Sequence, residues 1–165
     1  MRTIKRRRIE RKTDYKARLN LLKNEFPRIV VRKTNRYVLA QYVKSKEAQD
    51  YVLTLASSKE LLDYGWPEER RGSLKSIPAS YFTGLLLGKK IKKIEKKKAE
   101  AILDIGLVRN VKKSRIYGVL KGLIDSGIEI NYSKKKEIFP AETRIKGEHL
   151  KNKIDFEKIK EKILK

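Results

Sequence analysis

The stretch closest to a nucleotide-binding signature is GLLLGKK at residues 84–90. A phosphate-binding loop follows a strand, has four residues between its glycines and carries Ser or Thr after its Lys. This stretch has three residues between its glycines, a second Lys in place of the Ser or Thr, and lies inside an expected helix. The stretch therefore predicts a structural segment of a helix and does not predict a phosphate-binding loop.

Residues able to perform acid–base or metal chemistry are sparse. A two-metal nuclease site of the RNase H-like kind needs several converging carboxylates, beginning with one in the first strand. The first expected strand, RIVVRK (28–33), has none, and Asp104 is the only strand carboxylate near the middle of the chain. The single histidine, His149, has no identifiable orienting partner for general-base work. The chain has no cysteine, which excludes thiolate zinc sites and cysteine nucleophiles. From these observations together we expect no enzymatic activity, no metal and no cofactor.

Charge is the dominant chemical property of the sequence. The 165 residues include 43 Lys and Arg against 20 Asp and Glu, a formal net charge of +23. Such an excess opposes compaction unless a polyanion neutralises it, and nucleic acid is the usual partner. An anionic membrane surface would also fit the charge. The most apolar run, YFTGLLLG (81–88), is much shorter than the roughly 20 residues of a membrane span, so we expect no membrane-spanning segment. With nucleic acid as the favoured partner, we expect no membrane partner and no small-molecule substrate.

The densest basic block is at the N-terminus, where residues 2–12 carry seven Lys or Arg and one Glu. Such spacing lets cations neutralise successive phosphates and release counterions. The predicted contacts are Arg2, Lys5, Arg6, Arg7, Arg8, Arg11 and Lys12.

A second basic group surrounds an expected hairpin at residues 28–43. Two β-branched runs flank Thr34 and Asn35, which predict a two-residue turn. In that register Lys33 opposes Arg36 and Arg32 opposes Tyr37. Ile29, Val31, Val38 and Ala40 then share one face. An Arg32 guanidinium stacked on Tyr37 would suit an unpaired RNA base. An ordinary polar hairpin end is the alternative.

A third basic group, Lys112, Lys113 and Arg115, surrounds the start of an expected helix, with Ser114 as its candidate cap. Backbone N–H groups at a helix N-terminus attract phosphate, and the three cations would reinforce that attraction. A solvated loop is the alternative.

The elements that must hold these groups follow from hydrophobic periodicity. A helix is expected over residues 14–22 with Asp14 as its cap. Strands are expected at 28–43 (the hairpin), 51–57, 101–108 and 128–130. Helices are expected at 79–97, 115–127 and 155–165. The order predicts an α/β fold with a mixed sheet, namely a three-stranded antiparallel meander followed by α-β-α-β.

The same pattern divides the chain into three parts. Residues 1–26 form a basic N-terminal extension with a short helix, 27–132 an α/β core, and 133–165 a C-terminal extension with an amphipathic helix. In that last helix Phe156, Ile159 and Ile163 share one face.

Five stretches, in this order along the chain, resemble the family of large-subunit ribosomal protein number eighteen in its archaeal form: RRRIERKTDYKARL (6–19), RKTNRYVLAQ (32–41), YFTGLLLGKK (81–90), LDIGL (103–107) and SRIYGVLKGLIDSG (114–127). The family is similar to the eukaryotic 5S-binding protein number five.

The resemblance implies a non-enzymatic, ribosome-bound cytoplasmic protein with an RNase H-like core that lacks catalytic acids. It implies 5S rRNA, the large-subunit (23S-type) rRNA and neighbouring central-protuberance proteins as partners. By motif, the family's RNA contacts fall on the N-terminal block with KTDY (12–15), on the hairpin tip and on the KKSR turn (112–115). They add these residues to the predicted contacts: Thr13, Tyr15, Arg18, Arg32, Lys33, Thr34, Asn35, Arg36, Tyr37, Lys112, Lys113, Ser114 and Arg115.

Two rival functions stay open from the residues alone. One is a membrane-surface or general RNA- or polyanion-binding module, which would bind acidic vesicles and unrelated RNAs as well as 5S rRNA. The other is a divergent RNase H-like nuclease that depends on Asp104.

Overall fold

The computed structural model describes residues 3–47, 49–95, 99–132, 137–150 and 154–164. Its strands are β1 (Arg28–Lys33), β2 (Val38–Lys46), β3 (Gln49–Ser57), β4 (Glu100–Asp104) and β5 (Glu129–Ile130). Its α-helices are α1 (Arg6–Ile9), α2 (Tyr15–Lys23), α3 (Ile77–Ile94), α4 (Arg115–Asp125), α5 (Glu142–Lys146) and α6 (Phe156–Leu164). Two 3₁₀ helices, η1 (Ser58–Leu62) and η2 (Glu68–Ser73), connect β3 to α3.

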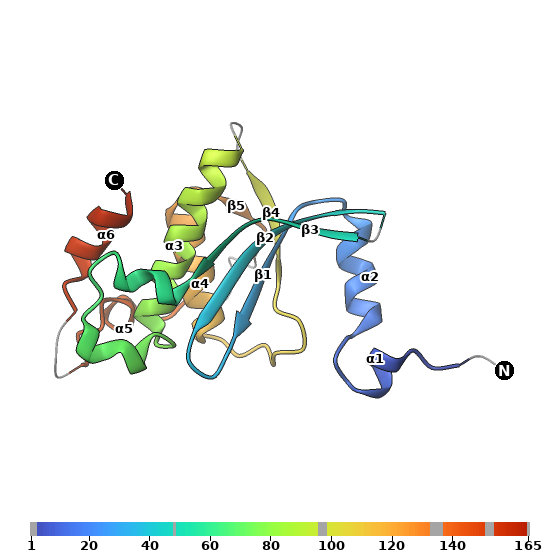
Figure 1. The fold of residues 1–165 in the computed structure, drawn as a ribbon, viewed down its shortest axis with the longest axis horizontal. Helices are drawn as coiled ribbons and strands as arrows, with labels where there is room; N and C mark the ends of the chain where they lie inside the picture. The colour runs from blue at the N-terminus through green and yellow to red at the C-terminus, as the bar shows by residue number, and fades with distance from the viewer. Residues whose placement is uncertain (1–2, 48, 96–98, 133–136, 151–153, 165) are drawn as a thin grey trace.

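The strands form one mixed sheet in the order β3-β2-β1-β4-β5. β1 pairs antiparallel with β2, and β2 with β3. β4 pairs parallel with β1, and β5 with β4. The predicted α/β class and mixed sheet are therefore confirmed. In Figure 1, helices α3 to α6 lie on one side of the sheet, and α1 and α2 lie on the other.

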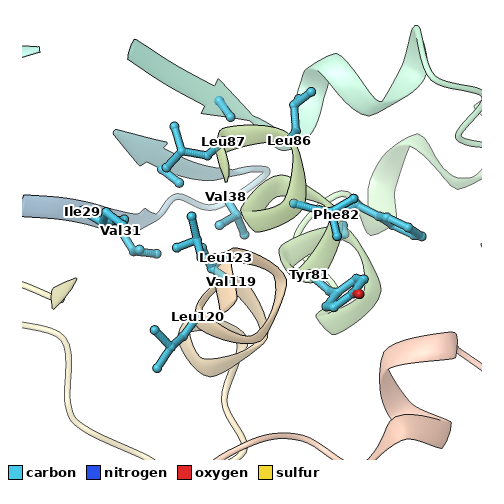
Figure 2. Close-up of a cluster of buried hydrophobic side chains, with 14 of the residues drawn as sticks. Ile29, Val31, Val38, Tyr81, Phe82, Leu86, Leu87, Val119, Leu120 and Leu123 are labelled. Carbon is cyan, nitrogen blue, oxygen red and sulfur yellow. The ribbon is translucent and has the colours of Figure 1, made fainter. Parts of the chain in front are cut away.

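The core lies between the sheet and the α3–α4 pair. Alternation along β1 sends Ile29 and Val31 to this side, and both are buried. Figure 2 shows these side chains and Val38 facing Val119 and Leu123 of α4. The face predicted from the sequence is confirmed.

The hairpin turn differs from the prediction by one residue. Lys33 pairs with Val38 and Arg32 with Leu39, so Asn35 and Arg36 occupy the turn and Arg32 does not oppose Tyr37. The cause is Thr34, whose backbone N–H and hydroxyl both donate to the Tyr37 carbonyl at 2.9 Å. Its hydroxyl also accepts from the Tyr37 N–H. The shift moves each partner by two positions, so the side chains keep their faces.

Helix boundaries follow their capping residues. Asp14 caps α2 by accepting from the Lys16 and Ala17 N–H groups, as predicted. α3 begins at Ile77, two residues before the prediction, because Ser76 accepts from the Ala79 N–H and Pro78 fits the first turn. α4 begins after Ser114 and ends at Asp125.

The GLLLGKK stretch has a packing role. A Cβ at Gly84 would overlap the Val119 carbonyl oxygen of α4, and a Cβ at Gly122 would overlap the Tyr81 carbonyl oxygen of α3. The two helices therefore approach each other closely enough that only glycine fits on either side. The position of residues 84–90 inside α3 agrees with the prediction that this stretch is part of a helix.

The C-terminal helix α6 packs on α3. The Phe156 ring lies 5.5 Å from the Tyr81 ring and 4.8 Å from the Phe82 ring, centroid to centroid. Ile159 and Ile163, on the predicted apolar face, are buried.

The Tyr81 hydroxyl donates to Asp125, and burial together with that carboxylate raises the pKa of Tyr81 above its ordinary value.

We predict that Gly122→Ala lowers the free energy of unfolding by about 1–3 kcal/mol, the usual penalty for overpacking. Urea denaturation followed by circular dichroism would measure it. Gly72→Ala is the matched control, since its Cβ would meet nothing within 4 Å. Equal stability of the two variants would contradict the close contact of α3 and α4.

Candidate nucleic-acid interface

Asp104 binds two arginines. The prediction that it is the only strand carboxylate near the middle of the chain is wrong, because β4 also contains Glu100. Asp104 lies at the end of β4, is buried, and accepts from Arg28 at 3.0 Å and from Arg32 at 3.3 Å. Among the described residues, no group of three or more His, Cys, Asp or Glu side chains could hold a metal ion. The Asp104 carboxylate therefore serves as an acceptor for two guanidinium groups.

Arg28 is the centre of this ion-pair network. Its side chain is 3% exposed, and its guanidinium donates to Asp104, to Asp50 at 2.6 Å and to Ser45 at 3.0 Å. These partners come from β4, β3 and β2, so one buried cation connects four strands. Removing a partner would leave a buried charge incompletely paired, which is strongly destabilising.

Asp50 extends the network to the N-terminal part of the chain. Its second oxygen accepts from Arg18 of α2 at 3.0 Å. Partial burial alone would raise the pKa of Asp50, but the hydrogen bond from Ser45 and the Arg28 and Arg18 guanidiniums lower this pKa below its ordinary value of 3.8. The charged carboxylate therefore helps hold α2 beside the sheet.

The other end of the network shapes the loop after β4. Asp104 accepts from the Gly106 N–H at 2.8 Å, and Arg32 donates to the Asp104 carbonyl at 3.0 Å. Gly106 has φ +62°, and a Cβ there would lie 2.9 Å from the Arg32 guanidinium carbon. The predicted strand over 101–108 is therefore too long, because this turn ends β4 at Asp104.

A groove of about 810 Å³ lies between the N-terminal part of the chain and this loop. We name it the arm groove; its lining comes from residues 7–24, Arg32 and residues 103–108. It brings together five predicted contact residues from two separate motifs: Arg7, Lys12, Thr13, Arg18 and Arg32.

The other described N-terminal candidates are not part of the lining of the arm groove. Lys5, Arg8 and Tyr15 line a smaller hollow, and the Lys5 ammonium lies 4.9 Å from the centre of the Tyr15 ring. Arg6 pairs with Glu10 at 2.7 Å on the exposed surface of α1. Arg11 is exposed and has φ +51°. Arg2 lies outside the described residues.

The hairpin tip presents four exposed candidates, Lys33, Thr34, Asn35 and Arg36. Tyr37 is half-buried and packs against the core. The predicted stacking of Arg32 on Tyr37 is wrong. Arg32 donates instead to the Val31 carbonyl and to Asp104, because the actual register places it opposite Leu39.

The third candidate group lies at the N-terminus of α4. Lys112 is exposed, and Lys113 pairs with Glu137 at 3.1 Å. Ser114 occupies the cap position, as predicted, but among the described atoms its buried hydroxyl has no hydrogen-bond partner. Arg115 is half-buried. The backbone donors of this turn are thus not satisfied by the cap side chain.

The hairpin tip and the loop after β4 share one edge of the sheet. β1 and β4 run parallel, so their carboxyl ends, which lead into the tip and the loop, meet at the same edge. In Figure 1 this edge and α1 lie along the lower side of the view.

Sequence reasoning missed Arg28 and Asp50 in the network, and Asn20, Asn24 and Leu107 in the arm groove.

The chain matches the family described as ribosomal large subunit proteins 60S L5, and 50S L18, over residues 1–100 and 91–133. No helix in the described ranges combines the length and the apolarity needed to cross a bilayer.

Three archaeal relatives named large ribosomal subunit protein uL18 are similar over most of the chain. The Korarchaeum cryptofilum protein is 49% identical over 145 residues, covering 88% of this chain and 70% of the relative. The Methanoculleus marisnigri protein is 43% identical, covering 88% and 78%. The Methanothrix thermoacetophila protein is 40% identical over 165 residues, covering 96% and 93%.

We predict that Asp50→Asn lowers the free energy of unfolding at neutral pH by about 1–2 kcal/mol, because Arg28 and Arg18 each lose a charged acceptor. The pKa of Asp50 is depressed in the folded chain, so its contribution is present above the unfolded pKa and is lost as pH falls through the folded pKa. As the pH falls below about 4, the free energy of unfolding should therefore decrease less in the variant than in the parent.

Urea titrations at a series of pH values would measure both effects. Asp63→Asn, at an exposed carboxylate, is the control and should retain the parent's stability at neutral pH. The network would be disproved as a stabilising element if both variants showed the same stability and pH profile.

Proposed function

Because the chain belongs to the family of large-subunit ribosomal proteins that includes 60S L5 and 50S L18, and to its archaeal uL18 branch, we propose that it binds 5S rRNA and attaches it to the large-subunit rRNA. In this role it is a structural, non-enzymatic constituent of the large subunit. As a ribosomal protein it is ribosome-bound in the cytoplasm. The proposal places it in the central protuberance, in contact with neighbouring ribosomal proteins.

The observation that carries the proposal is the gathering of cations from separate motifs around one groove. Arg7, Lys12 and Arg18 come from the N-terminal extension, and Arg32 comes from the hairpin. Phosphate contacts supply most of the affinity of such a surface, while contacts to bases select the folded RNA. A groove built from two motifs can follow the shape of one RNA better than a uniformly charged tail.

The sheet supports the finer fold proposal. Three antiparallel strands followed by two parallel strands, in the order β3-β2-β1-β4-β5, fit an RNase H-like core. In such a nuclease, carboxylates on neighbouring strands would bind metal ions. Here Arg28 and Arg32 occupy the Asp104 carboxylate, which supports a core that binds RNA without cleaving it.

In this proposal, the N-terminal extension (1–26), the hairpin tip and the 112–115 turn contact RNA around the core (27–132). In the C-terminal extension (133–165), helices α5 and α6 lie on the side of α3 away from the sheet (Figure 1), where they are available to protein neighbours. Packing of α6 against α3 through Phe156 is consistent with this arrangement.

We predict that replacing Arg6, Arg7 and Arg8 together with Ala flattens the slope of log K against log salt for 5S rRNA by about 2. Each phosphate contact contributes about 0.7–0.9 to this slope. Filter binding at several salt concentrations would measure it.

A matched variant replaces Lys158, Lys160 and Lys162 of α6 with Ala, which removes the same charge from the opposite side of the molecule. Its slope should equal that of the parent. An unchanged slope in the arginine variant would remove the N-terminal block from the contact set. Equal affinity for 5S rRNA, unrelated RNA and acidic vesicles at physiological salt would favour a general polyanion binder instead.

A further inference from the structure

The arm groove has a wall that phosphate binding alone does not require. Leu107 and Val108 line it while remaining 57% and 38% exposed. Leu21 and Ile105, both half-buried, also line it. Exposed apolar side chains that gather in a hollow beside cations indicate a ligand with both an apolar and an anionic part.

The apolar wall is held in place before any ligand binds. The loop that carries Leu107 and Val108 is fixed by the Gly106 N–H, which donates to Asp104, and by the Arg32 guanidinium against Gly106. Asp104 is in turn held by the buried Arg28. A wall with this support loses little conformational freedom on binding, which favours affinity.

The opposite wall comes from α2, which contributes Leu21 and also polar side chains. Asn20 and Asn24 line the arm groove one helical turn apart and are exposed. A side-chain amide both donates and accepts, so it can bind the edge of a nucleic-acid base, where donors and acceptors alternate.

The described lining of the arm groove includes four cations, Arg7, Lys12, Arg18 and Arg32, and two carboxylates, Asp14 and Asp104. Three of these cations pair with carboxylates: Lys12 with Glu10 at 2.9 Å, Arg18 with Asp50 at 3.0 Å and Arg32 with Asp104 at 3.3 Å. Arg7 donates to the neutral Thr13 hydroxyl at 2.8 Å. This bond orients the guanidinium without neutralising it, so Arg7 keeps its charge for a phosphate.

We propose that the arm groove binds one unpaired nucleotide of the RNA, which leaves its neighbours' stack and enters between α2 and the loop after β4. The base lies against Leu107, its edge contacts Asn20, and a flanking phosphate contacts Arg7. The inference rests on the proposed function and deepens it, because it names the part of the RNA that this surface selects. Unpaired bases that leave their stack are the usual targets of selective RNA recognition.

Two variants test the base contact. Leu107→Ala and Asn20→Ala should each weaken 5S rRNA binding about fivefold to tenfold, in the range of a lost base contact. Neither removes a charge, so the salt slope should stay that of the parent, whereas Arg7→Ala should flatten it by about 0.7–0.9. Leu164→Ala is the matched control, since Leu164 is 55% exposed on α6, away from the arm groove, and should bind like the parent.

Base-specific chemical probing of the complex provides the second readout. The parent should protect an unpaired base of 5S rRNA that becomes reactive again with Leu107→Ala, at protein concentrations that saturate both complexes. Unchanged affinity and protection in both uncharged variants would overturn the inference and leave a peptide segment as the remaining kind of occupant. If the parent itself fails to prefer 5S rRNA over an unrelated RNA, the proposed function fails instead, and this result is visible before any variant is compared.

Discussion

The buried pair of Arg28 and Asp104 is the interaction on which the rest of the binding surface depends. An arginine side chain that is 3% exposed is tolerable only with charged acceptors in good geometry, and Asp104 and Asp50 supply them. Through the same two carboxylates the pair sets the loop after β4 and holds α2 through Arg18. The sheet centre, the loop and the N-terminal helix are thus positioned by one continuous set of ion pairs.

Much of the fold could be predicted because its signals are local. The Asp14 cap, the alternation along β1 and the apolar face of α6 each depend on residues a few positions apart, and each is confirmed. The hairpin shows the limit of such signals. Period-two alternation gives the correct faces, but the turn has no glycine to fix it, and the side-chain bonds of Thr34 move it by one residue. A face survives that shift, whereas the cross-strand partner of Arg32 does not.

The network and the arm groove could not be predicted for a different reason. Arg28 and Asp104 are 76 residues apart, and their contact requires β4 to lie beside β1, which local patterns do not specify. One signal was present: Arg28 and Arg32 lie four apart on one face of a strand, and two buried or half-buried arginines need acceptors. The apolar wall was hidden because Ile105 to Val108 continue a strand-like composition past the turn at Gly106.

The glycine contact between α3 and α4 has a mechanical consequence. Helices that meet backbone to backbone at Gly84 and Gly122 have almost no side-chain layer between them to deform. In Figure 1, α1 and α2 lie on one side of the sheet, and α6 lies on the other, packed on α3. The α3–α4 pair is therefore a stiff backing for the sheet, and β1 and β4 keep a fixed base from which the hairpin tip and the loop after β4 project.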